Sequence, residues 1–251
     1  MDRLTWLGHA TVLFEVAGAR LITDPVLRSR VAHLRRHAPP AADPGRLDAI
    51  LISHLHHDHL DLATLRGLDP TAPIVVPRGA ARAVRRLRRE VREVAPGDEV
   101  ELGGVRVRVV PAEHDGRRLP GTRPAETVGF LLAGAYFAGD TELYDGMADL
   151  AGDVEVALLP IWGWGPRLGP GHMDPEQAAQ AAALVRPASA VPIHWGTFLP
   201  IGLHRRHGHL LRDPAQAFAR HLHDHAPGVR SEVLAVGDSL ALVPHECPEN
   251  G

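Results

Sequence analysis

Short apolar runs separated by turn residues cover much of the chain. Runs of this length, bounded by Gly, Pro and Asp, are typical of β-strands. Residues 105–110 alternate Val with Arg, as expected for a strand with one exposed face. The predicted strands are Leu4–Leu7, Thr11–Val16, Leu21–Thr23, Asp48–Ser53, Ile74–Val76, Val91–Val94, Glu99–Leu102, Val105–Val110, Thr127–Leu132, Ala135–Ala138, Val154–Pro160, Ala188–Ile193, Ser231–Leu234 and Ser239–Val243.

Helices are predicted between these strands. Asp174 is followed by Pro175, and Gln177 stands three residues after Asp174, as in a capping box. This helix is expected to end near Arg186. Residues 28–47, rich in Arg, Pro and Ala without a clear period, are interpreted as an irregular surface loop. Strands followed by helices, twice over, predict a layered α/β protein with two sheets and helices outside them. The other predicted helices are Leu60–Arg66, Arg78–Arg89 and Pro214–His225.

The composition indicates a soluble globular protein with one domain over residues 1–251. Apolar residues make up 45% of the chain and charged residues 23%, which excludes a disordered protein. A net charge of −3 gives no reason to expect nucleic acid or a membrane as partner. All 27 basic residues are Arg, which we interpret as a compositional bias and not as a phosphate-binding design.

The residues near the two ends of the chain indicate where the protein is located and which ligands a metal site can use. Met1–Leu7 lacks the basic and apolar regions of a signal peptide, and no run reaches the length of a membrane-spanning helix. We therefore expect a cytoplasmic protein. Cys247 is the only cysteine, so an intrachain disulfide is excluded and any metal site must use His and carboxylate ligands.

A dense histidine cluster follows the predicted strand at Asp48–Ser53. It contains the pattern H-x-H-x-D-H, whose fixed positions are His54, His56, Asp58 and His59. His54 and His56 point the same way if the strand continues, while Asp58 and His59 can turn toward a second centre. Crowded imidazoles repel one another when protonated, and burying them without partners is costly. A metal removes both problems, so the cluster indicates a metal site.

Three stretches of sequence resemble the metallo-β-lactamase superfamily. Besides the histidine pattern, Trp6–Leu13, Thr23–Pro25 and Pro192–Phe198 resemble the branch that contains L-ascorbate-6-phosphate lactonase and N-acylphosphatidylethanolamine phospholipase D. The resemblance covers nearly the whole chain. It implies an αββα sandwich with a dinuclear metal site at one edge.

The same resemblance implies three further ligands. His114, Asp140 and His194 match the later ligand positions of the family, and each follows a predicted strand. The implied set places three histidines, His54, His56 and His114, on one ion. Asp58, His59 and His194 bind the other, with Asp140 between them. Such a site leaves a position for water on the ions. A hydroxide that bridges the ions would attack the substrate, and Asp58, as a catalytic residue, would orient this hydroxide. Zinc is the default ion, with manganese or iron as alternatives.

Other residues are candidates for contact with the substrate. His172 either donates a proton to the leaving group or is a loop histidine near a helix start, and both interpretations stay open. Arg117, three residues after His114, is the best guanidinium candidate for binding a phosphate or carboxylate. Arg118 and Arg123 are interpreted as surface residues.

The resemblance places His9 near the active site, as a further substrate-binding candidate. Trp162 and Trp195, with Trp164 and Phe198, are expected to form an apolar pocket wall unless they belong to the core.

Several polar residues are interpreted as structural. Asp24 is expected to fix the turn before Pro25, and His57 to face away from the metals. The six histidines from His204 to His225 are interpreted as solvated surface, because His221, His223 and His225 alternate and therefore point to different faces of a helix. His204 is an exception, since it could belong to a lid.

These features favour a hydrolase that cleaves a phosphodiester, a lactone or a similar ester in a small-molecule or lipid-like substrate. A nuclease of the same superfamily is an alternative, although near-neutral charge gives no basic surface for nucleic acid. A di-iron redox protein and a non-catalytic metalloprotein are alternatives of another class. Homo-oligomerisation is left open.

Overall fold

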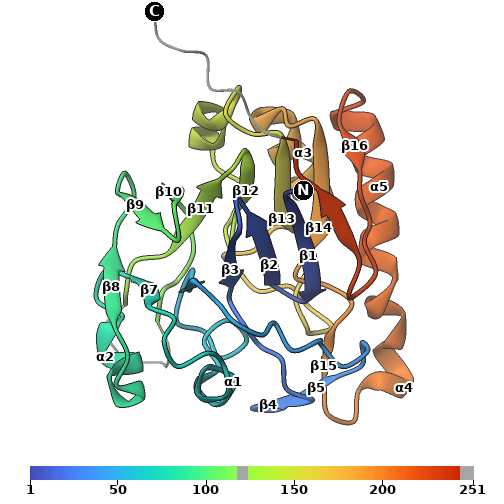
Figure 1. Cartoon of the computed structure of the whole chain (residues 1–251). Helices are drawn as coiled ribbons and strands as arrows, with labels where there is room; N and C mark the ends of the chain where they lie inside the picture. The colour runs from blue at the N-terminus through green and yellow to red at the C-terminus, as the bar shows by residue number, and fades with distance from the viewer. Residues whose placement is uncertain (118–123, 244–251) are drawn as a thin grey trace, which may run out of the picture.

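The first sheet combines antiparallel and parallel strands, as the computed structural model shows for residues 1–117 and 124–243 (Figure 1). From β17 to β3 the neighbours are antiparallel, and from β3 to β8 they are parallel. In spatial order the strands are β17 (Ser239–Ala241), β1 (Arg3–Gly8), β2 (Thr11–Val16), β3 (Ala19–Thr23), β6 (Ala49–Leu51), β7 (Ile74–Pro77) and β8 (Val91–Val94).

The second sheet is mixed in the same manner. Its strands are parallel from β16 to β12 and antiparallel from β12 to β9. In spatial order they are β16 (Arg230–Ser231), β14 (Ser189–Ile193), β13 (Val156–Pro160), β12 (Ala135–Phe137), β11 (Val128–Leu132), β10 (Val105–Pro111) and β9 (Glu99–Leu102). The two last strands of the chain therefore belong to different sheets.

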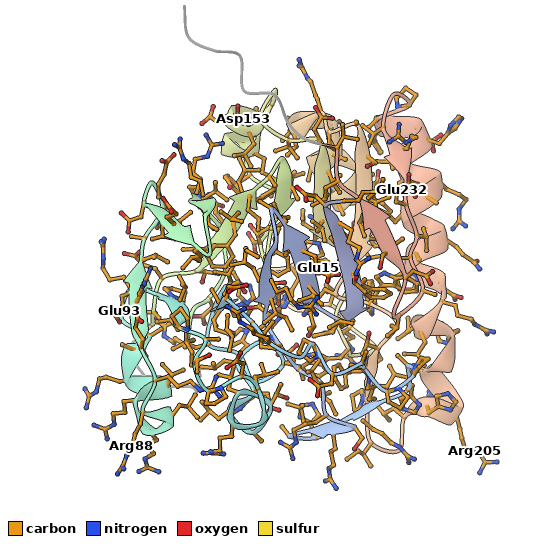
Figure 2. The ribbon with its side chains drawn as sticks, in the orientation of Figure 1. Glu15, Arg88, Glu93, Asp153, Arg205 and Glu232 are labelled. Atoms are coloured by element: carbon orange, nitrogen blue, oxygen red, sulfur yellow. The ribbon has the colours of Figure 1, made fainter. Side chains whose placement is uncertain are left out.

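The sheets face one another across a shared apolar core. Trp6 and Phe14 of the first sheet lie in one buried cluster with Phe130 and Phe137 of the second. Helices α1 (Leu62–Gly67) and α2 (Ala81–Val84) cover the outer face of the first sheet, and α3 (Pro175–Val185) and α5 (Asp213–His225) cover that of the second (Figure 1). This arrangement is the predicted αββα sandwich. Charged side chains such as Arg88 and Arg205 project from its periphery (Figure 2).

The start of α3 follows the sequence signals. Asp174 accepts hydrogen bonds from the backbone N–H groups of Glu176 and Gln177, and the Gln177 side chain accepts from the backbone N–H of Asp174. Behind this cap, Ala178 and Ala182 are fully buried against the second sheet and α5. Small side chains there let the helix lie close to both.

The interpretation of residues 28–47 as irregular was wrong. Two short strands, β4 (Arg30–Val31) and β5 (Leu34–Arg36), form a hairpin that pairs with β15 (Phe198–Pro200) in a separate three-stranded sheet. Arg36 is 8% exposed; its guanidinium donates to the carbonyls of Val26 and Pro39 and lies 5.7 Å from the Phe198 ring centroid. The hairpin depends on β15, a partner remote in sequence.

The predicted basic helix at Arg78–Arg89 is shorter than expected. Only α2 and a 3₁₀ turn at Arg85–Leu87 form, because Arg88 adopts a left-handed backbone with φ of 54° and ends the helix. The chain also contains elements without a predicted counterpart: a 3₁₀ helix at Asp145–Leu150, α4 (His204–His207) and a 3₁₀ turn at Gly208–Leu211. None of the helices in the described ranges is both long and apolar enough to cross a bilayer.

Candidate metal centre

Histidines and carboxylates gather where strands of both sheets end. His54 follows β6, His114 follows β10, and His194 follows β14. Asp140 follows β12 and His9 follows β1. Because these strand ends lie at one edge of the sandwich, the fold brings together residues that are far apart in sequence.

Two four-residue clusters result, each with its ligand atoms within 4.8 Å of one another. One cluster contains His54, His56, His114 and Asp140. There the Nε2 atom of His114 lies 3.0 Å from Nδ1 of His56. The other contains His9, Asp58, His59 and His194. All seven predicted ligands lie in these clusters, together with His9, which was predicted as a substrate contact.

Asp140 lies between the clusters. Its Oδ2 is 3.1 Å from His59 Nε2 and 3.8 Å from His54 Nε2, and its Oδ1 is 3.3 Å from His194 Nε2. The side chain is 1% exposed. One carboxylate thus faces nitrogen atoms of both groups, as the family resemblance implied for a bridging ligand.

Hydrogen bonds on the outer side of the rings fix which nitrogen faces inward. The Nδ1 atoms of His114 and His194 face the carbonyl oxygens of Gly171 and Trp162. A carbonyl only accepts, so each Nδ1 carries the proton and, in the neutral ring, each Nε2 presents a lone pair. His59 is held in the same way by Asp24. Nε2 atoms of His59 and His194 then meet at 3.0 Å.

Gly171 is required at its position for this geometry. Its backbone φ is +81°, and a Cβ there would lie 2.6 Å from His114 Nδ1. The loop before α3 therefore approaches His114 closely enough for a main-chain hydrogen bond because residue 171 has no side chain.

Lowered pKa values at three of the clustered histidines favour ligation. Burial, strengthened by the charge of His194, lowers the pKa of His9 to about 3. Burial lowers the pKa of His114 to about 4 despite the negative charge of Asp140, and it holds the pKa of His54 well below its usual value. Neutral imidazoles are the form that binds metals.

Unsatisfied polar atoms supply a test of whether ions fit here. Within the described ranges, His54 Nε2 and Asp140 Oδ1 are buried without a hydrogen-bond partner, which is costly in the absence of a bound group. The nitrogen and oxygen atoms of the clusters direct their lone pairs toward one another, and cations bound between them would stabilise this arrangement. Imidazole and carboxylate donors suit zinc, manganese or iron, so the residues fit two divalent ions.

Three residues of this region have a strained backbone. Asp24, His9 and His194 have φ values of 38°, 55° and 61°, in the left-handed region that non-glycine residues avoid. The His194 N–H donates to the His9 carbonyl at 2.9 Å. Such strained residues cluster at functional sites.

A cavity of about 260 Å³ opens over the clusters. His56, Asp58 and Asp140 line its floor, and the β4–β5 hairpin and Trp164 line its wall. His57 also borders it, contrary to the expectation that it faces away, although it belongs to neither cluster. The remaining lining residues are Val31, Ala32, His33, Leu34 and His172.

His172 reaches the centre from the loop before α3. Its Nε2 is 3.3 Å from Asp140 Oδ2. Although burial lowers the pKa of His172, its hydrogen bond to Asp140 and the charge of that carboxylate raise the pKa to about 9. The geometry places the His172 imidazole beside the cavity.

The other predicted substrate contacts lie elsewhere, so their role stays a prediction. Arg117 is exposed and pairs with Asp115 at 3.3 Å. His9 is 1% exposed beneath the cavity, with Nε2 2.9 Å from Asp58. Trp195 stacks on Trp6, with ring centroids 5.5 Å apart. Trp162 lines a different cavity, between α3 and α5. Arg118 and Arg123 lie outside the described residues.

Two contributions were missed at the sequence level. His33 lines the cavity and packs edge-on against Trp164, an expected wall residue, at 4.8 Å between ring centroids. Asp24 does more than fix a turn, because it accepts a hydrogen bond from His59. A buried Thr-Asp-Pro after a strand was the available signal for Asp24; the sequence held none for His33.

Comparison with known proteins identifies a family and several relatives. A family model described as a beta-lactamase superfamily domain matches residues 19–195. A UPF0173 metal-dependent hydrolase of Methanopyrus kandleri is 33% identical over an alignment 259 residues long, gaps included. The alignment covers 94% of this chain and 98% of that protein. An N-acyl-phosphatidylethanolamine-hydrolyzing phospholipase D of Caenorhabditis elegans is 31% identical over 79% of this chain and 64% of its own.

Other relatives are longer than this chain. An uncharacterized protein of Mycobacterium tuberculosis is 33% identical over 78% of this chain, and the match spans 59% of that protein's length. Among solved structures, a metallo hydrolase of Ignicoccus hospitalis has a TM-score of 0.70 at 22% identity, covering 95% of this chain and 97% of its own. A diiron β-hydroxylase of Streptomyces venezuelae has a TM-score of 0.71 at 21% identity, covering 96% and 54%. These two structures share the fold.

The family match, the M. kandleri relative and the paired histidine–carboxylate clusters lead to one assignment. The chain belongs to the metallo-β-lactamase superfamily of metal-dependent hydrolases.

Proposed function

We propose that the protein is a dinuclear hydrolase whose two ions lie on either side of Asp140. Three histidines, His54, His56 and His114, would hold one ion, and Asp58, His59 and His194 the other. The observation that carries this proposal is the contact of a single buried carboxylate with nitrogens of both clusters. Zinc is the proposed ion, by its preference for imidazole-rich sites. We also propose that the chain acts as one domain, since both sheets contribute to one core.

Residues of the chain would handle the protons of the reaction. When bound, the ions would polarise the scissile group and lower the pKa of water from 15.7 toward roughly 7. Asp58 is held as a carboxylate: although burial raises its pKa, its contacts with the imidazoles of His194 and His9 hold the pKa well below its usual value. Its Oδ atoms can accept a hydrogen bond from the attacking water and orient it. His172 Nε2 would donate a proton to the leaving group.

The cavity wall bears on the substrate. Val31, Leu34 and Trp164 present apolar surface next to the polar floor. This combination suits a phosphodiester or carboxylic ester that carries an apolar chain. The C. elegans relative, named for hydrolysis of an acylated phospholipid, supports the same substrate class.

Metal analysis with a substrate screen tests the proposal. The purified protein should contain about two equivalents of metal and, with zinc or manganese, cleave a chromogenic phosphodiester, an acyl ester or a lactone. The variant His56→Ala should lose metal and activity without unfolding. His57→Ala is the matched control for metal content, because His57 is the adjacent histidine outside both clusters. Absence of metal and of hydrolysis after reconstitution would overturn the proposal.

A further inference from the structure

A third group of metal-binding side chains lies on the outer face of the second sheet's helices. His221 and His225 stand four residues apart on α5 and so share one face of the helix. Their ring centroids are 6.3 Å apart. The alternation of His221, His223 and His225 predicts that the three side chains point to different faces of the helix. In the structure His221 and His225 lie on the same face, and only His223 points elsewhere.

The neighbouring helix supplies a carboxylate to the same point. Glu176 lies in the first turn of α3, which packs along α5. Its Oε1 is 3.4 Å from His225 Nε2. The ligand atoms of Glu176, His221 and His225 all lie within 4.8 Å of one another. None of the three belongs to the clusters around Asp140.

We propose that Glu176, His221 and His225 form a separate mononuclear site for zinc or a similar divalent transition metal. Two imidazoles and one carboxylate are a common ligand set for zinc, with water in the fourth position. Tetrahedral ligands at ~2.0–2.1 Å from an ion lie roughly 3.4 Å apart. The observed separations therefore need only a small rotation of side chains. Glu176 and His225 are exposed and His221 partly so, and such side chains rotate freely.

A simple ion pair between His225 and Glu176 is the competing explanation for their contact. It uses two of the residues and gives no role to His221. A metal uses all three. The contribution of His221 therefore distinguishes the two explanations.

The position of the site indicates what it would do. An ion there would join the first turn of α3 to the C-terminal half of α5. The helix α3 begins directly after the loop that carries His172 and Gly171. The site would thus fix the base of the segment that reaches the catalytic centre, without supplying a ligand to it.

Zinc titration of the full-length protein tests this site. Protein first loaded with zinc and then desalted keeps tightly held ions, which are counted by metal analysis. Calorimetric titration with further zinc should show one additional equivalent, and excess zinc should raise Tm. In the variants His221→Ala and Glu176→Gln, the affinity for this additional ion should fall by about tenfold or more, and the zinc-dependent rise in Tm should be lost.

His223→Ala is the matched control, since His223 is an exposed histidine on the same helix outside the group. It should keep the additional equivalent. The proposal is overturned if wild-type protein binds no additional zinc, or if His221→Ala and His223→Ala behave alike. The desalted protein's own metal content reports on the centre around Asp140, so failure of one site is not mistaken for failure of the other.

Discussion

The Nδ1 atom of His59 lies 2.7 Å from Oδ2 of Asp24, and both residues are fully buried. Asp24 also accepts from the backbone N–H of Ser53 at 2.7 Å. One carboxylate therefore orients a proposed ligand and holds the chain where it leaves β6 toward the histidine cluster. Carboxylates in this position orient a metal-binding imidazole and increase its basicity.

The variant Asp24→Asn should bind its metals about 10–100-fold more weakly, because the amide keeps the shape but loses the charge facing His59. Competition with a chromogenic chelator measures this affinity. Asp48→Asn, which alters an acceptor for the backbone N–H of Arg20, should bind metals as wild type does. Equal affinities for Asp24→Asn and wild type would show that Asp24 is only a turn residue.

Removal of metal should destabilise the fold. Asp58 and Asp140 are ionised and buried at 8% and 1% exposure, so an ion that binds only the native state adds stability. With free metal at 100–1,000 times Kd the linkage is about 2.7–4.1 kcal/mol, or on the order of 10 °C in Tm for a chain of this size. Thermal unfolding with and without chelator measures the difference. An unchanged Tm would contradict the proposed ligand set.

His172→Ala should affect substrates according to their leaving group. An alkoxide needs a proton as it departs, so kcat for an alkyl ester should fall about 100-fold or more. Nitrophenolate departs without one, so kcat for a nitrophenyl ester should change little. Metal content should match wild type. An equal loss for both substrates would mean that His172 acts in another way, for example by positioning Asp140.

Trp164→Ala should weaken binding of substrates with a long apolar chain. Loss of this wall is expected to raise KM about tenfold, equivalent to 1.4 kcal/mol, which lies below the value for burying a large apolar side chain. An acetyl ester should be unaffected. Leu210→Ala is the control, because Leu210 is an apolar residue that lines a different cavity. A similar rise for both variants, or for the acetyl ester, would argue against a chain-binding wall.

Asp69, which lies outside the metal clusters, should make the free energy of unfolding depend on pH. Hydrogen bonds from the Thr71 hydroxyl and from the backbone N–H groups of Thr71 and Leu47 lower the pKa of Asp69 to about 2. An unfolded Asp has a pKa of about 3.9, so the stabilisation is complete above about pH 4 and disappears as pH falls toward 2. Asp69→Asn should therefore be less stable than wild type at pH 6, with the difference shrinking between pH 4 and 2. Denaturant unfolding at several pH values measures it; a constant difference would contradict the assignment.

Local patterns in the sequence account for most of the sandwich. Alternation at residues 105–110 and the box around Asp174 depend on neighbours along the chain, and both structures form as predicted. The hairpin at β4–β5 was missed because it pairs with β15. A chain segment whose partner is remote carries little signal of its own.

Some residues of the candidate site could also be predicted from the sequence, and others could not. Strand ends, together with the family resemblance, brought the seven predicted ligands to one edge. Which tryptophan faces the cavity could not be read from the sequence. Trp162 donates from Nε1 to the Gly165 carbonyl and accepts at its own carbonyl from His194, and this fold of the loop turns Trp164 toward His33. The orientation of Trp164 therefore depends on one local hydrogen bond and on one from His194, which is remote in sequence.

The small sheet of β4, β5 and β15 lies apart from the two sheets that carry the proposed ligands. Its hairpin supplies four lining residues of the cavity, Val31, Ala32, His33 and Leu34, and none of the proposed metal ligands. If the protein acts as proposed, part of its substrate recognition is encoded in a stretch of the chain separate from the metal ligands. Mutation of residues 31–34 can alter which molecules enter while the chemistry is retained, and this hairpin is the natural place to randomise when selecting enzymes with new substrates.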